Sequence, residues 1–360
     1  MDFVATQSIL HTFFIPTKLS VFKIDPDIRK ARTIDTDFYT CSRHFDDSKE
    51  KIFSRSWHLL GRLDDLDQLT PSVLLPGFLD EPVLTVKSED GVSCISNVCT
   101  HRAKLLIEEP CQGNLIRCRY HGRRFDLGGK MISMPEFDEV EDFPSESDNL
   151  PSIACGSAGG FFFASINPTA NLFDFCEGAE SVFDRYRSFK LELVGTRDYL
   201  INAHWALYCE NYLEGFHLPY VHRSLNEVVD YGNYRTDLFR YSSLQTGYDM
   251  DGGLAASYLF VFPNLMFNIY PWGISVNVVR PIAPDRTVVE FRTYAWDKSL
   301  MNEGAGADLH SVELEDEAVV ESVQKGVRSR FYRSGRYSPS REQGTHHFHR
   351  LIAEFMNPSS

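Results

Sequence analysis

Short runs of alternating apolar and polar positions characterise residues 55–165. These runs are rich in β-branched and aromatic residues and are separated by Gly, Pro, Asp and Ser, a pattern that predicts short strands joined by turns. The clearest runs lie at 58–62, 72–75, 83–87, 92–96 and 161–165. We therefore predict an all-β domain over residues 55–165.

The pattern changes after residue 165, where helical and extended stretches are mixed. Apolar residues at helical spacing predict helices at 183–193, 205–217 and 311–330, and another in the middle of 35–57. Four runs with Pro and Gly between them predict consecutive strands at 255–262, 265–270, 274–280 and 287–296. Strands joined in this way form an antiparallel sheet, and helices packed on it make an α+β domain. Residues 332–349 are polar, and we predict a loop there.

Composition and charge exclude several classes of protein. The formal net charge of −14 argues against nucleic acid or an anionic membrane as a partner. No apolar stretch reaches the roughly 20 residues of a membrane span. The N-terminus does not resemble a signal peptide, because Asp2 stands where positive charge is expected. The 8 cysteines form no Cys-x-x-Cys pair, so we expect reduced thiols and a cytoplasmic protein.

Cysteine and histidine occur together in two short loops. Cys99 and His101 form a Cys-x-His pair, and Cys118 and His121 form a Cys-x-x-His pair. Residues two apart in an extended backbone point to the same side, and a tight turn achieves the same at the longer spacing. An iron–sulfur cluster with two Cys on one iron and two His on the other takes this ligand set. A zinc ion bound by Cys2His2, and core residues without a metal, are the alternatives.

A second group of metal-binding residues follows in the predicted α+β domain. Glu214 and His217 are three residues apart, so on a helix they share a face and can touch. His217 and His222 are five apart and would diverge on a regular helix, but Pro219 predicts that the helix ends or kinks between them. We therefore expect the two histidines to converge.

A carboxylate on the predicted C-terminal helix is a candidate third ligand. The apolar residues of this helix form one arc, and Asp316 falls in its middle; the arc consists of Leu309, Val312, Val319, Val320, Val323 and Val327. Burying an unpaired carboxylate is costly, so Asp316 requires a cation, for which a metal is one candidate. Helix capping or an ion pair with Arg is the alternative. Glu313 and Gln324 are assigned to the polar face, and Glu315 lies off the arc.

With these two sites, the chain resembles the catalytic α subunit of the Rieske non-haem iron oxygenases. Arg117–Lys130 is similar to the second cluster loop of that family followed by a hairpin, with Gly128-Gly129 at the turn. The resemblance covers most of the chain. It implies an all-β Rieske domain at 55–165 and a helix-grip catalytic domain at 166–360, on which we expect residues 1–54 to pack.

The resemblance also implies cofactors, partners and residue roles. Cys99, His101, Cys118 and His121 match the [2Fe-2S] ligands, and His217, His222 and Asp316 match the ligands of a mononuclear Fe(II). Glu214 matches the carboxylate that relays electrons to the iron from a cluster histidine, here His121, of a neighbouring subunit of a homotrimer. The implied cosubstrate is O2. Because the chain has no Gly-x-Gly-x-x-Gly fingerprint, NAD(P)H is expected to act through a separate flavin or ferredoxin-type reductase.

The expected small-molecule substrate is a quaternary ammonium compound. Residues 211–217, 263–273 and 315–324 are more similar to the choline, glycine betaine and carnitine monooxygenase branch than to the ring dioxygenases. Aromatic faces bind a trimethylammonium group, and the candidates are Phe262, Phe267, Tyr270 and Trp272. Aromatic ring hydroxylation or aryl O-demethylation is the alternative within the enzyme class. A Rieske electron carrier without catalysis is the alternative outside it.

Overall fold

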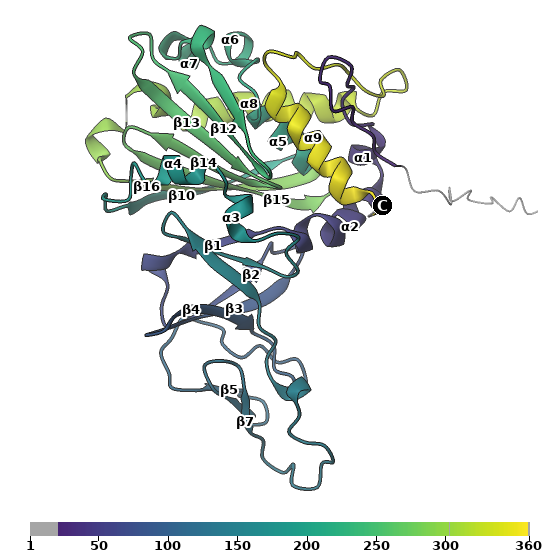
Figure 1. Cartoon of the computed structure of the whole chain (residues 1–360), viewed down its shortest axis with the longest axis vertical. Helices are drawn as coiled ribbons and strands as arrows, with labels where there is room; N and C mark the ends of the chain where they lie inside the picture. The colour runs from purple at the N-terminus through teal and green to yellow at the C-terminus, as the bar shows by residue number, and fades with distance from the viewer. Residues whose placement is uncertain (1–20, 302, 359–360) are drawn as a thin grey trace, which may run out of the picture.

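The molecule is elongated, with a large sheet and most helices at one end and three small sheets tapering to the other (Figure 1). The computed structural model describes residues 21–301 and 303–358. The expectation about a signal peptide concerns residues 1–20 and so lies outside the described residues. Within these limits the fold is built from a main body and a narrow β-rich end.

Three antiparallel three-stranded sheets form the narrow end. The first has the order β1 (His58–Arg62), β9 (Phe161–Ser165) and β8 (Ala154–Ala158). The second consists of β2 (Leu69–Leu74), β3 (Glu81–Ser88) and β4 (Gly91–Ser96). The third consists of β5 (Ile116–Arg117), β6 (Arg124–Phe125) and β7 (Met131–Ser133), and it lies at the tip in Figure 1. The short strands predicted between residues 58 and 165 are thereby confirmed.

One seven-stranded antiparallel sheet dominates the main body, in the order β10-β16-β15-β14-β13-β12-β11. Its strands are β10 (Glu192–Ile201), β11 (Arg235–Leu238), β12 (Ser242–Tyr248), β13 (Leu254–Val261), β14 (Leu265–Tyr270), β15 (Gly273–Ala283) and β16 (Arg286–Ala295). The four predicted strands correspond to β13–β16. Because helices pack on an antiparallel sheet, the α+β class is confirmed.

Helices lie against this sheet and before β1. They are α1 (Asp37–Thr40), α2 (Ser42–Lys51), α3 (Leu172–Phe175), α4 (Ala179–Phe183), α5 (Trp205–Tyr212), α6 (Leu218–Val221), α7 (Arg223–Val228), α8 (Leu309–Gly326) and α9 (Gln343–Met356). In Figure 1, α6 and α7 lie at the end of the molecule opposite β5 and β7.

One hydrophobic core joins the segment before β1 to the main body. Trp205 on α5 is fully buried, and its ring packs against Phe53 at 5.0 Å, Phe38 at 6.2 Å and Phe348 at 5.9 Å between ring centroids. These partners come from before β1 and from α9. Residues 22–57 are therefore fixed against α5, the helix that leads into the His217 segment.

The helix predicted at 183–193 is wrong. α4 ends at Phe183, and β10 begins at Glu192. β10 is an edge strand that pairs only with β16, so nearly all of its side chains are exposed. A strand without a buried face lacks the alternation that would distinguish it in the sequence.

The loop predicted at 332–349 is also wrong, because α9 begins at Gln343. This helix buries His346 and His349 beside Phe348, Leu351 and Ile352. Three histidines within four positions, 346, 347 and 349, made the segment look polar. In the structure two of these histidines are buried, so the segment packs into the core as a helix.

None of the helices in the described part of the chain combines the length and the hydropathy that crossing a bilayer requires.

Candidate active site and metal centres

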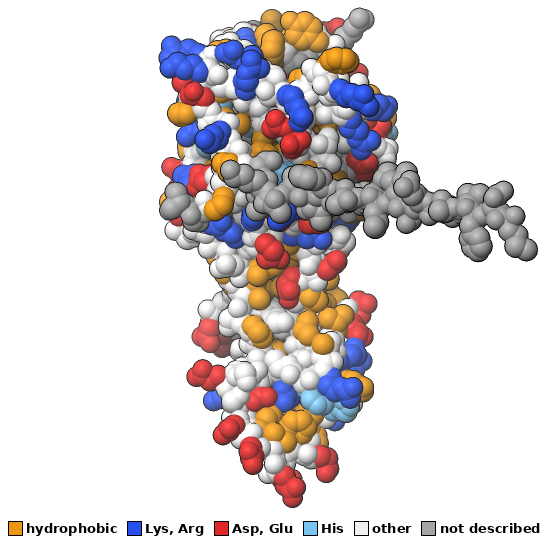
Figure 2. Space-filling model, turned by 90° about the vertical axis from the view of Figure 1, so that its right-hand side faces the viewer, with side chains coloured by type: hydrophobic (Ala, Val, Ile, Leu, Met, Phe, Trp, Pro, Cys, Tyr) orange, Lys and Arg blue, Asp and Glu red, His pale blue; other side chains and the backbone are white. Residues whose placement is uncertain are grey.

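The two Cys/His loops face each other in the narrow end, where the second loop joins β5 to β6. The Cys99 and Cys118 thiols are buried and close enough to hydrogen bond. The rings of His101 and His121 lie 4.9 Å apart between centroids, and His121 is exposed. Figure 2 shows histidine side chains at the surface of this narrow part. The four residues thus form a sulfur pair and an imidazole pair.

Hydrogen bonds hold the loops in this arrangement. The buried Arg123 guanidinium donates to Thr100 Oγ1 at 2.7 Å, and Thr100 Oγ1 donates to the backbone oxygen of Asp148 at 2.7 Å. Gly122 closes the second loop with a φ of 80°, in the region that favours glycine. Thr100 lies between Cys99 and His101 and Arg123 directly follows the second loop, so this contact joins the two loops.

The paired arrangement fits a binuclear cluster better than one zinc ion. In the described residues these four ligand atoms do not gather within 4.8 Å of one another in the way the atoms of a single-ion site do. A Rieske cluster takes two Cys on one iron and two His on the other. Separate sulfur and imidazole pairs meet that requirement.

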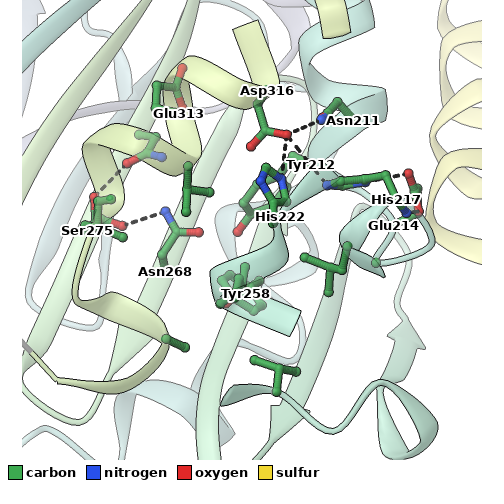
Figure 3. Close-up of a pocket in the computed structure, with 18 of the residues that line it drawn as sticks. Asn211, Tyr212, Glu214, His217, His222, Tyr258, Asn268, Ser275, Glu313 and Asp316 are labelled. Atoms are coloured by element: carbon green, nitrogen blue, oxygen red, sulfur yellow. Dashed lines mark hydrogen bonds and ion pairs between the residues drawn. The ribbon is translucent and has the colours of Figure 1, made fainter. Parts of the chain in front are cut away.

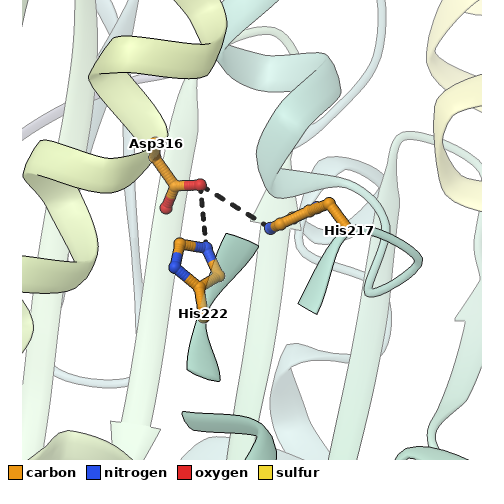
Figure 4. Close-up of side chains that lie close together, drawn as sticks. All are labelled: His217, His222 and Asp316. Atoms are coloured by element: carbon orange, nitrogen blue, oxygen red, sulfur yellow. Dashed lines mark hydrogen bonds and ion pairs between the residues drawn. The ribbon is translucent and has the colours of Figure 1, made fainter. Parts of the chain in front are cut away.

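A second centre lies in the main body, where His217, His222 and Asp316 converge (Figure 4). Their ligand atoms all lie within 4.8 Å of one another. Asp316 Oδ1 is 3.0 Å from His222 Nε2 and 3.6 Å from His217 Nε2. All three side chains line one cavity. Two imidazoles and one carboxylate beside an open cavity are the donor set of non-haem Fe(II) oxygenases, so these residues fit a single iron ion.

Both histidines are oriented by carboxylates on their other ring nitrogen, and Figure 3 shows the contact between Glu214 and His217. Glu214 Oε1 lies 2.7 Å from His217 Nδ1, and Glu315 Oε2 lies 2.7 Å from His222 Nδ1. A carboxylate at Nδ1 holds the proton there and leaves Nε2 free to bind a metal. Burial opposes the protonated form of His222, but Asp316 and Glu315 outweigh burial and raise its pKa. The centre therefore favours a cation.

The chain between the two histidines differs from the predicted broken helix. α5 ends at Tyr212, and Glu214 lies in the following turn rather than on one helix with His217. Its Oε2 accepts from the backbone N–H groups of Phe216 and of His217. Pro219 lies in the first turn of α6, where a missing N–H costs nothing. The short α6 then turns the chain so that His222 faces His217. The two histidines therefore converge as predicted, but because of this short helix and not because a longer helix is broken at Pro219.

The buried face of α8 also differs from the predicted apolar arc. Glu313 is 4% exposed and Gln324 is 3% exposed, whereas Val323 is 43% exposed. Tyr208 on α5 donates to Glu313 Oε2 at 2.8 Å, and the backbone N–H of His204 donates to Gln324 Oε1 at 2.9 Å. These two polar contacts to α5 rotate the helix away from the orientation expected from its apolar residues.

Five tyrosines contribute to the wall of the cavity beside the three converging side chains. Tyr208, Tyr212, Tyr234, Tyr258 and Tyr270 line it. Burial raises the pKa of each of these hydroxyls, so the rings are neutral. The cavity is thus an aromatic chamber that opens onto the His217 centre.

Only part of the expected aromatic pocket lines this cavity. Tyr270 does so, but Phe262 and Phe267 lie in the core, and Trp272 packs behind Tyr270 with ring centroids 5.2 Å apart. Phe262 contacts Phe355 at 5.0 Å between centroids. Strand alternation explains the difference, because only some side chains of a strand face the cavity.

Several residues at the site were not predicted. Asn211 donates to Asp316 Oδ1 at 2.7 Å, and Glu315 contacts His222. Glu313 lies three residues before Asp316, so helical spacing alone would have put both on one face. The tyrosines on β13 and after α7 come from distant segments, and no local spacing connects them.

Comparisons with known proteins identify two domains in the chain. Residues 56–144 match the Rieske [2Fe-2S] domain, and residues 235–358 match the ring hydroxylating alpha subunit (catalytic domain). Choline monooxygenase, chloroplastic, from Arabidopsis thaliana is 28% identical over 92% of this chain and 85% of its own length. Carnitine monooxygenase oxygenase subunit from Escherichia coli (strain K12) is 27% identical over 91% of this chain and 94% of its own.

A solved structure extends the agreement to the fold. It is a quaternary ammonium Rieske monooxygenase, described for carnitine oxidation by gut microbiota and inter-subunit electron transfer. It superposes with a TM-score of 0.77 over 93% of this chain and 100% of that chain, at 23% identity. A Rieske domain implies a [2Fe-2S] cluster, and the catalytic domain implies a mononuclear iron. The chain therefore belongs to the Rieske non-haem iron oxygenases, enzymes that oxidise small substrates with oxygen, as a catalytic α subunit.

Proposed function

We propose that the chain is the oxygenase component that hydroxylates or demethylates a quaternary ammonium compound. The observation that carries this proposal is the tyrosine-walled cavity beside His217, His222 and Asp316. Aromatic faces attract quaternary ammonium groups through cation–π interactions, which strengthen when water is excluded. The relatives that act on choline and carnitine support the same substrate class.

Each centre has a proposed ligand set. Cys99, His101, Cys118 and His121 would hold the cluster, and His217, His222 and Asp316 would hold the iron. When bound, the cluster supplies electrons one at a time and the iron supplies oxygen activation. Glu214 and Glu315 hold the Nδ1 protons of the two histidines, and the tyrosines offer aromatic faces to a substrate in the cavity.

We also propose that Glu214 links two subunits. α6, which follows Glu214, and β5, which precedes Cys118, lie at opposite ends of one chain (Figure 1), so transfer within a chain would be long. His121 is exposed at its tip and available to a neighbouring copy. A homotrimer in which His121 of one copy meets Glu214 of the next provides the short route, in keeping with the inter-subunit transfer described for the solved relative.

The remaining proposals concern partners and organisation. Electrons would come from NAD(P)H through a separate flavin or ferredoxin-type reductase, with O2 as cosubstrate. We divide the chain into a Rieske domain at 55–165 and a catalytic domain at 166–360. Of the N-terminal segment 1–54, residues 21–54 are described and pack on the catalytic domain, as the contact between Phe53 and Trp205 supports. The free cysteines suit the cytoplasm, which we propose as the location.

Substrate-dependent turnover tests the proposed function. The iron- and cluster-loaded protein is supplied with NADH and a generic reductase, and O2 uptake is followed with choline, glycine betaine, L-carnitine and simple aromatic compounds. We expect uptake and an aldehyde product, including formaldehyde if a methyl group is removed, only with quaternary amines. Oxidation of the aromatic compounds alone would refute the proposal and support ring or aryl-ether oxidation instead.

A further inference from the structure

A buried carboxylate that takes no part in the proposed iron site lines the same cavity. Glu313 on α8 is 4% exposed. Its Oε2 accepts a hydrogen bond from Tyr208 at 2.8 Å, while its Oε1 is buried and has no hydrogen-bond partner among the described residues. A buried carboxylate oxygen without a partner is costly, so this atom calls for a ligand that the protein itself does not supply.

The charges around the cavity identify that ligand as a cation. The lining includes three carboxylates, Glu214, Glu313 and Asp316, and none of the lining side chains that the structure describes belongs to Lys or Arg. Glu214 is bound to His217, and Asp316 to Asn211 and His222. Of the three, Glu313 is the carboxylate with a buried oxygen that has no hydrogen-bond partner among the described residues.

Neutral hydrogen-bonding groups on β14 and β15 complete the lining (Figure 3). These are Asn268, Ser275 and Asn277, all buried, with Ser275 Oγ donating to Asn277 Oδ1 at 2.9 Å. They suit a hydroxyl or another uncharged group of a substrate. They provide no positive charge that would balance a substrate carboxylate.

We propose that Glu313 is a specificity-determining residue whose carboxylate faces the ammonium group of the substrate and selects molecules of net positive charge over zwitterions. This inference rests on the proposed oxidation of quaternary amines and narrows it to cations whose other end is neutral. A zwitterion would bring its own carboxylate into the same chamber as the Glu313 carboxylate, and like charges in a low-dielectric site repel strongly.

The pKa of Glu313 agrees with the inference that this carboxylate lacks a positively charged partner in the protein alone. Burial, opposed by the hydrogen bond from Tyr208 and reinforced by the nearby Asp316 and Glu317, raises the pKa of Glu313 to about 8. The charge of His222, like the hydrogen bond from Tyr208, lowers the pKa of Glu313. The folded protein alone therefore does not stabilise the charged carboxylate, as expected for a group that awaits a positively charged ligand.

Binding calorimetry on the iron- and cluster-loaded protein tests the inference. The probes are choline, its uncharged carbon isostere 3,3-dimethyl-1-butanol, and the zwitterion glycine betaine. Glu313→Gln keeps the shape and hydrogen-bonding capacity of the side chain but removes the charge. Glu321→Gln is the matched control, because Glu321 lies further along the same helix and does not line the cavity.

We expect the wild type to bind choline at least tenfold more tightly than either other probe. Glu313→Gln should weaken choline binding at least tenfold, leave the isostere unchanged and, in turnover, raise KM with little effect on kcat. Glu321→Gln should behave as wild type. Unchanged choline binding in Glu313→Gln would overturn the inference.

The wild-type protein alone also provides a decisive comparison if Glu313→Gln does not fold. Equal binding of choline and glycine betaine would overturn charge selection while leaving the proposed function intact. Failure of the wild type to bind or oxidise any quaternary amine would instead refute the proposed function and this inference together.

Discussion

His222 Nδ1 lies 2.7 Å from Glu315 Oε2, a contact that orients the most deeply buried imidazole of the proposed iron centre. In the sequence, Glu315 lies off the apolar arc of its helix, and this position gave no sign of the role. In the structure its side chain is 44% exposed. It belongs to α8 and directly precedes Asp316, so one turn of helix provides both a proposed ligand and the group that orients another.

We predict that Glu315→Gln lowers iron affinity about tenfold, because groups that orient metal-binding histidines typically contribute 10–100-fold. Chelator competition on the purified protein measures this, with Glu227→Gln, an exposed carboxylate on α7, as the control. Equal iron retention in both variants would show that Glu315 does not orient His222 for binding.

Metal analysis should separate the two centres. The loaded wild type is expected to contain about three irons and two acid-labile sulfides per chain. Asp316→Ala should retain two irons and the visible spectrum of the cluster, whereas Cys118→Ala should lose the sulfide. A full complement of iron in Asp316→Ala would contradict the assignment of that ligand.

Assayed with excess Fe(II), which offsets the weaker orientation of His217, Glu214→Ala is predicted to keep both metals and to abolish turnover, because it removes the proposed link between His217 and a neighbouring subunit. Metal content, together with the rate at which the reduced cluster is reoxidised after addition of substrate and oxygen, distinguishes loss of transfer from loss of iron. Glu214→Gln, which keeps the side-chain length, serves as the matched variant. A near wild-type rate in Glu214→Ala would refute the relay.

Substitutions of Tyr212 test whether the tyrosine rings that line the cavity bind the ammonium group of the substrate. Its hydroxyl is buried with no hydrogen-bond partner among the described residues, so Tyr212→Phe removes no polar contact and should leave KM for a quaternary amine nearly unchanged. Tyr212→Leu removes the aromatic face and should raise KM about tenfold, since a desolvated cation–π contact contributes roughly 1–2 kcal/mol. Similar KM values for the two variants would indicate that the ring face does not contact the cation.

Buried His204 should make the fold sensitive to acid. Burial lowers the pKa of His204 to about 3, from an ordinary value of 6.5. The unfolded chain therefore takes up a proton as the pH falls below 6.5, while the folded chain does not, and this stability contribution is lost progressively toward the folded pKa. Between pH 8 and pH 5 the loss from this residue is about 2 kcal/mol.

Urea unfolding of wild type and His204→Asn at the two pH values measures this contribution. His204 Nδ1 accepts from the backbone N–H of Ala206 at the start of α5, and Asn retains a suitable capping group. The variant should lose about 2 kcal/mol less than the wild type between pH 8 and pH 5. Equal losses would show that His204 is not the responsible group.

Most of the site residues that the sequence identified were found from their short spacing along the chain. The loops at Cys99–His101 and Cys118–His121 and the Glu214–His217 pair need only short-range geometry, and the structure brings the members of each group close together. Glu313 was assigned to the polar face because its partner, Tyr208, lies 105 residues away in the chain. β10 and α9 were missed because an exposed edge strand and a helix rich in buried histidine both depart from the usual apolar pattern.

The two sets of proposed ligands differ in how far apart they lie along the chain. The four cluster residues fall between Cys99 and His121, in two neighbouring loops, whereas His222 and Asp316 are 94 residues apart and are separated by β11–β16. Loops closed by nearby residues form early, and contacts across long separations form late. The cluster pocket can thus take shape on a short stretch of newly made chain, while the iron pocket exists only after the large sheet has paired. Cofactor insertion during biosynthesis should follow the same order.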